Sequence, residues 1–265
     1  MASNLAKKGK INGSFIVYYR TVSCARQFQA LNPNIVVAES AAEAAAKADI
    51  ITCLGNGKLF VDCSTIHPYT TPAIANNFQD AGAQFVASPV FGAPAMAAAG
   101  QVICVLAGPR ESVDKVKSST TGVIAKSFVD FTDQQHAKAS QLKILGNTFV
   151  LRMFKSIAEG HVLADKCELG TDALHQFFES VSPGPYVAYS TACSHTREEP
   201  LFAVGLARKD ARHALDLAKR PGTAINGVEM ADEYMGRVKK HMGELGDVAG
   251  IYGAVREVAG LNFEN

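Results

Sequence analysis

The hydrophobic pattern divides the chain into two parts with different periodicities. Up to about residue 135, short runs of β-branched and aromatic residues take turns with helix-like segments, which predicts an α/β fold built on a doubly wound parallel sheet. After that point the apolar positions recur at helical spacing alone, which predicts helices. We therefore expect an α/β domain over residues 1–135 and an all-α domain over residues 136–265.

The strands of the first part are predicted from its apolar runs, namely Ser14–Arg20, Asn34–Glu39, Asp49–Leu54, Lys58–Cys63, Gln84–Val90, Val102–Ala107 and Ser127–Thr132. The helices between them are expected over residues 1–9, Cys24–Leu31, Ala41–Ala48, Tyr69–Gly82 and Glu111–Ser118. Gly9 is expected to end the first helix. Ser40 followed by Glu43 predicts a capping box at the start of the alanine-rich helix.

The link between the runs Asp49–Leu54 and Lys58–Cys63 conflicts with a parallel sheet. Both runs are almost continuously apolar, as in buried parallel strands, but only Gly55-Asn56-Gly57 separates them. Parallel neighbours need a crossover of a dozen or more residues, whereas a short glycine-asparagine link suits an antiparallel hairpin. Either the pair is a hairpin, or the crossover helix usual in such folds is absent from this chain.

The second part begins with one long helical segment, Ala137 to about Lys166, which contains no proline. At 1.5 Å per residue it would be roughly 45 Å long, a length that suits a link between two domains. Lys143 and Asn147 lie one helical turn apart on a shared face. Its apolar stripe is predicted to consist of Leu142, Leu145, Phe149 and Met153.

The later helices are expected over Thr171–Val181, Ala203–Lys219, Thr223–Met242 and Val248–Ala259, with a loop around Pro183-Gly184-Pro185.

Composition and charge exclude two classes of partner. The formal net charge is +1, with 48% hydrophobic and 19% charged residues, so nothing attracts the chain to nucleic acid or to a membrane surface. No apolar run approaches the length of a membrane span, and the first ten residues are too polar for a signal peptide. We expect a cytoplasmic location.

The cysteines are scattered, without a C-x-x-C pair or the spacing of a metal site. Most of them fall inside apolar runs. We interpret them as reduced thiols of the core.

Candidate chemistry lies where the predicted strands end, because ligands of doubly wound sheets bind outside the carboxyl ends of the strands. Arg20 ends the first strand, where an arginine can select the 2′-phosphate of NADP, although an arginine in this place is usually just solvated. Ser64 and Thr65 follow another strand, and their hydroxyls could contact a ligand or simply cap the next helix. The turn Phe91-Gly92-Ala93-Pro94 would let backbone N–H groups approach a carboxylate.

Two lysines stand near polar partners in the helical part. Lys143, if partly desolvated in a cleft, could give or take a proton near neutral pH, with the amide of Asn147 orienting a substrate. K-x-x-x-N alone has little specificity, because exposed lysines are common on helices. Lys209-Asp210 lies early in a later helix, where the simplest interpretation is an exposed charged face.

Taken in order, these segments resemble the β-hydroxyacid dehydrogenases, the group of 3-hydroxyisobutyrate dehydrogenase and of glyoxylate and succinic semialdehyde reductases, within the 6-phosphogluconate dehydrogenase-like superfamily. VYYRT resembles the family's V-Y-N-R-T, and FVDCSTIHP resembles V-D-x-S-T-x-x-P. VASPVFGAPAMAAAGQV resembles D-A-P-V-S-G-G-x-x-x-A-x-x-G-x-L, KILGN matches K-x-x-x-N, and FAVGLARKD matches F-x-x-x-L-x-x-K-D. The resemblance covers nearly the whole chain and implies a Rossmann-like sheet followed by a helical domain.

The resemblance also implies a role for each matching residue. Lys143 would be the general acid when a carbonyl is reduced and the general base in the reverse direction, with Asn147 holding the substrate. Phe91, Gly92 and Ala93 would form the carboxylate-binding turn. The substrate would be a small hydroxy acid or aldehyde acid, and the chain would form a homo-oligomer through its helical domain. NADP, or alternatively NAD, would be contacted by Arg20, Thr21, Leu54, Thr65 and Lys209, with Arg20 favouring NADPH.

The chain departs from the family pattern in three places. The family's S-G-G turn reads Phe91-Gly92-Ala93, so that a bulky ring replaces a hydroxyl donor, and Ala87 stands where the family has an acid. Relatives begin with a strand and a glycine loop that cradles the pyrophosphate, whereas Met1 falls inside the helix that follows that loop. The crossover helix expected after the run Asp49–Leu54 has no counterpart.

Three functions therefore compete. The leading one is an NADP-dependent oxidoreductase of this family. The second is a truncated or degenerate relative that binds no cofactor. The missing glycine loop and crossover helix favour this second hypothesis. The third is a specificity like that of the imine reductases, against which Lys143 argues, because those relatives usually carry another residue at its position.

Overall fold

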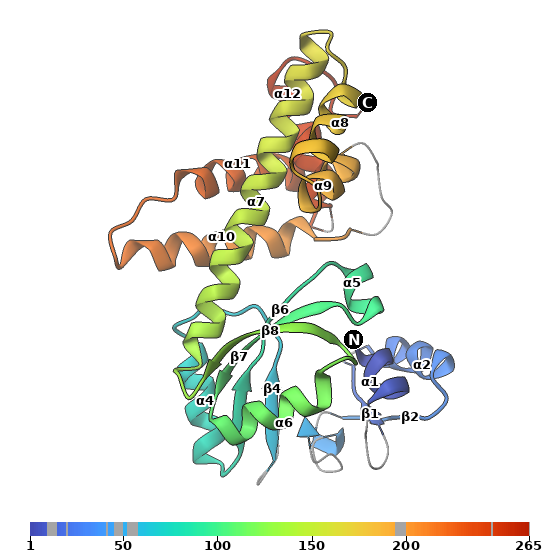
Figure 1. The fold of residues 1–265 in the computed structure, drawn as a ribbon, viewed down its shortest axis with the longest axis vertical. Helices are drawn as coiled ribbons and strands as arrows, with labels where there is room; N and C mark the ends of the chain where they lie inside the picture. The colour runs from blue at the N-terminus through green and yellow to red at the C-terminus, as the bar shows by residue number, and fades with distance from the viewer. Residues whose placement is uncertain are drawn as a thin grey trace. The chain divides into compact units, whose positions relative to one another are not determined.

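The computed structural model describes residues 1–9, 15–19, 21–40, 42–44, 58–193, 200–244 and 246–264, together with the backbone of residues 50–51. The chain divides into two compact units, Met1–Lys143 and Ile144–Asn265. The first unit contains strands and helices and the second contains helices, which confirms the predicted fold class (Figure 1). The division falls inside one long helix, α7 (Ala137–Lys166). The domain boundary at residues 135 and 136 stays a prediction.

The strands of the first unit form two sheets. β1 (Phe15–Val17) and β2 (Ile35–Val37) pair in parallel as a two-stranded sheet. The larger sheet has the order β3-β4-β5-β7-β6, with β8 also paired to β7. Its strands are β3 (Ile50–Ile51), β4 (Leu59–Asp62), β5 (Gln84–Ala87), β6 (Val90–Phe91), β7 (Val102–Gly108) and β8 (Ala125–Thr132).

β3 and β4 pair in parallel, with Ile50 opposite Leu59. The hairpin interpretation of this segment is therefore wrong, whereas the alternative, that a crossover helix is absent, stays a prediction because residues 52–57 lie outside the described part of the chain. The connection, residues 52–58, is shorter than the dozen or more residues that parallel neighbours normally need. The Gly55-Asn56-Gly57 sequence favours a hairpin turn locally, but the strands before and after it pair in parallel in the sheet.

The sheet is mixed rather than fully parallel. β4 and β5 are parallel, as are β7 and β8, but β7 runs antiparallel to both β5 and β6. The predicted strand Gln84–Val90 is interrupted at Pro89, which has no N–H to give to a ladder, although its carbonyl accepts from Val105 N at 2.9 Å. The link from β6 to β7 holds only the short helix α5 (Pro94–Ala99), so the chain returns as an antiparallel neighbour.

The other helices of the first unit lie close to their predicted positions, and they are α1 (Ala2–Lys8), α2 (Val22–Leu31), α4 (Thr71–Asp80) and α6 (Arg110–Thr120). Gly9 ends α1 as predicted, with its N–H donating to Leu5 O. Residues 42–44 are helical, and Glu43 N donates to Ser40 Oγ at 3.0 Å. The Glu43 carboxylate accepts a hydrogen bond from Glu39 N at 2.9 Å, one residue before the Ser40 N–H that a capping box uses.

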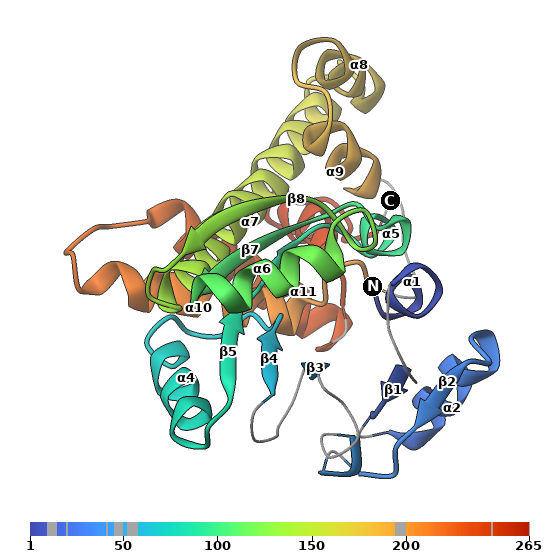
Figure 2. The same ribbon diagram turned by 60° about the horizontal axis from the view of Figure 1, so that its bottom comes forward.

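Alternate residues of the central strands build two cores on opposite faces of the sheet. On one face, Phe85 and Val105 pack with α4 and with the first turns of α7. On the other face, Val86 and Leu106 pack with α6, which lies across β7 in Figure 2. The start of α7 is thereby part of the first unit's core.

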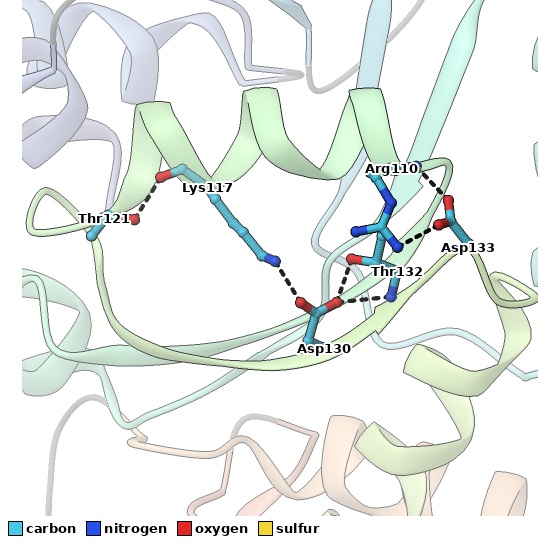
Figure 3. Close-up of polar contacts among 6 residues, drawn as sticks. All are labelled: Arg110, Lys117, Thr121, Asp130, Thr132 and Asp133. Atoms are coloured by element: carbon cyan, nitrogen blue, oxygen red, sulfur yellow. Dashed lines mark hydrogen bonds and ion pairs between the residues drawn. The ribbon is translucent and has the colours of Figure 1, made fainter.

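Polar contacts hold α6 to β8 just before α7 begins (Figure 3). Asp133, which has a positive φ of 58°, accepts from the backbone N–H of Arg110 at 2.8 Å and pairs with its guanidinium at 2.7 Å. Asp133 therefore acts as a non-local cap for the first turn of α6. Asp130 pairs with Lys117 and accepts from Thr132, and these contacts lower the pKa of its carboxyl to about 2.

The second unit contains α8 (Thr171–Val181), α9 (Pro185–Cys193), α10 (Val204–Lys219), α11 (Asn226–Met242), a 3₁₀ turn η1 (Val248–Gly250) and α12 (Ile251–Val258). α9 was not predicted, because the Pro-Gly-Pro sequence before it indicated only a loop. Among the described residues, even the long α7 is not apolar enough for a membrane-spanning helix, and neither is any other helix.

The predicted apolar stripe of α7 is wrong in its central positions. Leu145 is 50% exposed and Phe149 is 63% exposed. The side that enters the core of the second unit carries Ile144, Leu151 and Phe154 instead. Both sets recur at helical spacing, so periodicity could not distinguish them.

Two histidines share one buried serine in the second unit. His161 Nε2 on α7 and His175 Nδ1 on α8 lie 2.8 Å and 2.9 Å from Ser190 Oγ on α9. Burial lowers the pKa of His161, and the nearby His175 lowers it further. The folded chain therefore favours the neutral imidazole at position 161.

We predict that stability falls as the pH drops below the ordinary pKa of histidine, 6.5, because the unfolded chain then binds a proton that folded His161 resists. Urea unfolding between pH 8 and pH 5 should show a smaller loss for His161→Gln than for the parent. His136, whose pKa burial also lowers, supplies part of the remaining slope. Ser190→Ala is the control, since it removes the shared hydroxyl but keeps both rings and the pH dependence. An unchanged slope in His161→Gln would contradict this account.

Candidate functional site

The turn predicted to bind substrate joins β6 to α5. Phe91 ends β6, where it pairs with Ile103 of β7, and Ala93 is the residue before the first turn of α5. Gly92 lies between them with φ at +148°. A Cβ on Gly92 would come within 3.0 Å of Val102 Cγ1, so only glycine fits this position without strain.

The first turns of α7 are fixed on the sheet by specific contacts. His136 Nε2, just before the helix, lies 3.0 Å from the Phe85 carbonyl, and Ser140 Oγ lies 2.7 Å from Thr71 Oγ1 in a buried pair. Ala139 is completely buried in the same core. These contacts hold the backbone that carries Lys143, the final residue of the first unit.

Lys143 lies beside the turn Phe91–Ala93, which is predicted to bind substrate. Its Nζ atom is 4.5 Å from the centroid of the Phe91 ring, within the range of a cation–π contact. From the sequence, only the family resemblance predicts that these two residues share a site. The structure brings their side chains together, which makes a lysine ammonium part of the surroundings of this turn.

A second polar group forms within the helical unit around Asp210. Its carboxylate is only 4% exposed, accepts from Asn147 Nδ2 at 2.6 Å and lies 3.1 Å from Lys209 Nζ. Because a carboxylate only accepts hydrogen bonds, the atom of Asn147 that faces it must be the amide nitrogen. The amide oxygen of Asn147 is therefore directed away from Asp210.

Asp210 is the functional candidate that the sequence analysis missed. The interpretation of Lys209-Asp210 as an exposed charged face is wrong for Asp210, although Lys209 is 39% exposed in its side chain. The available signal was the K-D pair within the fifth family motif. A buried carboxylate in this place needs partners, and Asn147 and Lys209 supply them.

The predicted cofactor residues are placed separately. Thr65 is half-buried after β4, and α4 begins only at Thr71 with Thr70 before it, so the alternative that Ser64 or Thr65 caps this helix is wrong. Ser64 N instead donates to Asp62 Oδ1 at 2.9 Å. Thr21 is exposed at the start of α2, after a strand of the smaller sheet.

Arg20 and Leu54 lie outside the described residues.

The edge of the sheet that is predicted to bind the cofactor is described in part. Parallel strands β4 and β5 end on the same side of the sheet, where Ser64 and Thr65 offer hydroxyl groups. β1, which leads to Thr21, is not hydrogen-bonded to this sheet. Of the predicted cofactor residues, Thr65 therefore follows a strand of the larger sheet, whereas Thr21 follows a strand of the smaller one.

The thiols do not add a nucleophile to this edge. Burial, followed by the neighbouring Cys104 and Asp62, raises the pKa of Cys63 to about 12, so that it stays protonated near neutral pH. The cysteines of the described chain are free, but Cys24 and Cys167 are exposed. The expectation of core thiols is therefore wrong for those two.

Apart from the cofactor residues already placed, the predicted site residues form two groups, one in each unit. Phe91, Gly92, Ala93 and Lys143 belong to the first, and Asn147 and Lys209 belong to the second with Asp210. Lys143 and Asn147 are four residues apart on α7.

Comparison with known proteins finds similarity over nearly the whole chain. Residues 34–129 match the family described as the NAD binding domain of 6-phosphogluconate dehydrogenase. The NADH-dependent oxidoreductase ucdB of Aspergillus ustus is 31% identical, with 99% of this chain and 97% of the relative covered. Glyoxylate/succinic semialdehyde reductase 1 of Arabidopsis thaliana is 24% identical over 71% of this chain and 64% of the relative.

Solved structures share the fold at low sequence identity. The 3-hydroxyisobutyrate dehydrogenase of Salmonella typhimurium has a TM-score of 0.81 at 17% identity, covering 95% of this chain and 94% of that one. Psf3 in complex with NADP+ and 2-OPP has a TM-score of 0.81 at 18% identity, covering 96% and 95%. The alignment with ucdB spans 285 positions, more than the 265 residues of this chain, so this chain lacks residues at some internal positions.

We predict that Asp210 and Asn147 are energetically coupled. Asp210→Ala and Asn147→Ala should each lower the free energy of unfolding, and the double variant should lose less than their sum, with a coupling of about 1–3 kcal/mol measured by urea denaturation. Asp232→Ala is the matched control, because Asp232 pairs with Arg208 between α10 and α11 and should be additive with Asn147→Ala. Additivity of Asp210→Ala with Asn147→Ala would show that the 2.6 Å contact contributes nothing.

Proposed function

The chain belongs to the β-hydroxyacid dehydrogenase family, and residues 34–129 match the NAD binding domain of 6-phosphogluconate dehydrogenase. From this premise we propose that the chain transfers a hydride between NADPH and a small hydroxy acid or aldehyde acid. The proposal rests on the position of Lys143, which the first turns of α7 hold beside the turn Phe91–Ala93. A fixed lysine next to a substrate turn is the arrangement that general acid catalysis requires.

Lys143 transfers the proton of the reaction. When a carbonyl is reduced, the Nζ ammonium donates a proton to the carbonyl oxygen and becomes a neutral amine. In the reverse direction the amine takes the hydroxyl proton. The nicotinamide group, when bound, supplies or accepts the hydride. The hydride and the proton together convert the carbonyl to an alcohol.

The neighbouring residues bind the substrate. The backbone N–H groups of Gly92 and Ala93 bind its carboxylate, and Gly92 allows the close approach because it has no side chain. Asn147 holds the substrate with the amide group that Asp210 orients. This orientation matters because a small displacement of the substrate costs much of the rate.

The cofactor is bound by Arg20, Thr21, Leu54, Thr65 and Lys209, and Arg20 favours NADPH by pairing with its 2′-phosphate. Both cofactors occur among the relatives, since ucdB is named NADH-dependent and Psf3 was solved with NADP+. The chain also forms a homo-oligomer through its helical unit. Exposed apolar side chains there, such as Phe149, Leu163 and Phe177, support such an association.

A non-catalytic relative that binds no cofactor is the second candidate. It is favoured by the seven-residue link between the parallel strands β3 and β4 and by the internal gaps in the alignment with ucdB. Titration of the purified chain with NADPH, followed by nicotinamide fluorescence, separates the two functions. Binding supports the oxidoreductase, and no binding at millimolar NADPH would overturn it.

We predict that Lys143→Met lowers kcat for NADPH-dependent reduction of glyoxylate or succinic semialdehyde by at least about 100-fold, since a positioned general acid contributes at least this factor. The affinity for NADPH should change little. Lys138→Met is the control, because Lys138 lies on the same helix but donates to Gln134 at the surface, and it should keep the parent rate. Comparable rates in Lys143→Met and the parent would refute the assigned role.

We predict that Arg20→Ala weakens NADPH binding about tenfold, the loss of one charge-assisted contact to a phosphate, and changes NADH binding little. Fluorescence titration with both cofactors measures the difference. Arg26→Ala, which removes an exposed arginine 3.9 Å from Glu39, controls for the change in net charge. Equal losses for NADPH and NADH would contradict a contact with the 2′-phosphate.

A further inference from the structure

Phe91 occupies an unusual place for an aromatic ring. It is the first residue of the substrate turn, where the family pattern has a serine hydroxyl that donates a hydrogen bond. A phenyl ring cannot donate a hydrogen bond, so Phe91 cannot make the contact that the serine hydroxyl of the family pattern makes.

The Phe91 ring is held in place from two sides. Its backbone pairs with Ile103 in the antiparallel ladder of β6 and β7. Its side chain packs against the core that contains Phe85, Val105 and Ala139. Ala139 lies on α7 one turn before Lys143, so ring and lysine are anchored to the same core.

The contact between ring and lysine is electrostatic as well as steric. Nζ of Lys143 lies 4.5 Å from the ring centroid, and the face of an aromatic ring carries the negative part of its quadrupole. The attraction acts on the ammonium, not on the neutral amine. The ring therefore stabilises the protonated form of Lys143, which is the form that donates a proton.

We propose that Phe91 is a positioning residue for Lys143, whose ammonium it holds beside the substrate turn through a cation–π contact. The inference rests on the proposed function for its effect on rate. The contact itself can be measured without turnover. In place of a hydroxyl that contacts substrate, this chain has a ring that orients the proton donor.

The simplest rival is that Phe91 only fills the core. Replacement by fluorinated phenylalanines with one, two and three fluorine atoms separates the two roles, because fluorine withdraws electron density from the ring face while nearly preserving its shape. We expect the single-turnover rate of NADPH-dependent reduction to fall stepwise, by about fivefold at three fluorines, the fold-change that corresponds to ~1 kcal/mol of cation–π attraction. The same series at Phe131, which packs against the same core, is the control and should leave the rate unchanged.

A second measurement needs no activity. In the protein labelled with ¹³C-lysine, the ε-methylene resonance of Lys143, assigned with Lys143→Arg, should be shifted upfield by the ring current of Phe91. In Phe91→Leu, which retains apolar volume without a ring, this shift should disappear. A folded Phe91→Leu is recognised by its unchanged remaining lysine spectrum, and the fluorinated series replaces this variant if it does not fold.

Each result decides one point. An upfield shift that depends on the ring, together with a stepwise loss of rate, supports the proposal. Absence of the shift in the parent, or rates that do not change across the series, would overturn it. A parent that shows the shift but neither binds NADPH nor reduces either aldehyde acid would overturn the proposed function and the effect on rate, while leaving the contact between Phe91 and Lys143 established.

Discussion

The packing of the first turns of α7 on the central sheet is the constraint on which the candidate site depends. Ala139 is buried in the same core as the strand residue Phe85, and the Thr71–Ser140 hydroxyl pair and the His136 contact to the Phe85 carbonyl fix the rotation of the helix. A helix transmits such a fixed position along its axis because its backbone is rigid over a turn. Lys143, one turn after Ala139, is therefore held beside the turn Phe91–Ala93, where its Nζ lies over the Phe91 ring at the end of β6.

Burial of charge imposes a second constraint in the helical unit. Asp210 is removed from water, so its carboxylate must be compensated, and it is compensated by two residues of the family motifs, Asn147 and Lys209. The same contacts that lower the cost of burial also set the direction of the Asn147 amide. Stability and orientation therefore arise from one arrangement.

Much of the fold could be predicted from the sequence, but the sheet could not be predicted fully. Ala137–Lys166 was predicted as one helix because a long proline-free segment with helical spacing is a local signal. The direction of β3 relative to β4 was left open between two alternatives, and the antiparallel return of β7 was not predicted, because strand direction depends on partners distant in sequence. Of the site, Lys143 and the turn around Gly92 followed from the family motifs, whereas Asp210 was taken for a surface residue.

The sequence by itself determined most of the helices and strands, though not α5 or α9, together with the cap at Ser40, the end of α1 at Gly9 and the order of the family motifs. These depend on neighbours within a few residues, through backbone sterics and local hydrogen bonds. Only the tertiary structure decided which face of α7 is buried, that Asp210 is buried, and that the Phe91 ring meets the Lys143 ammonium. Such choices rest on contacts between segments far apart in the chain, among which a local pattern cannot select.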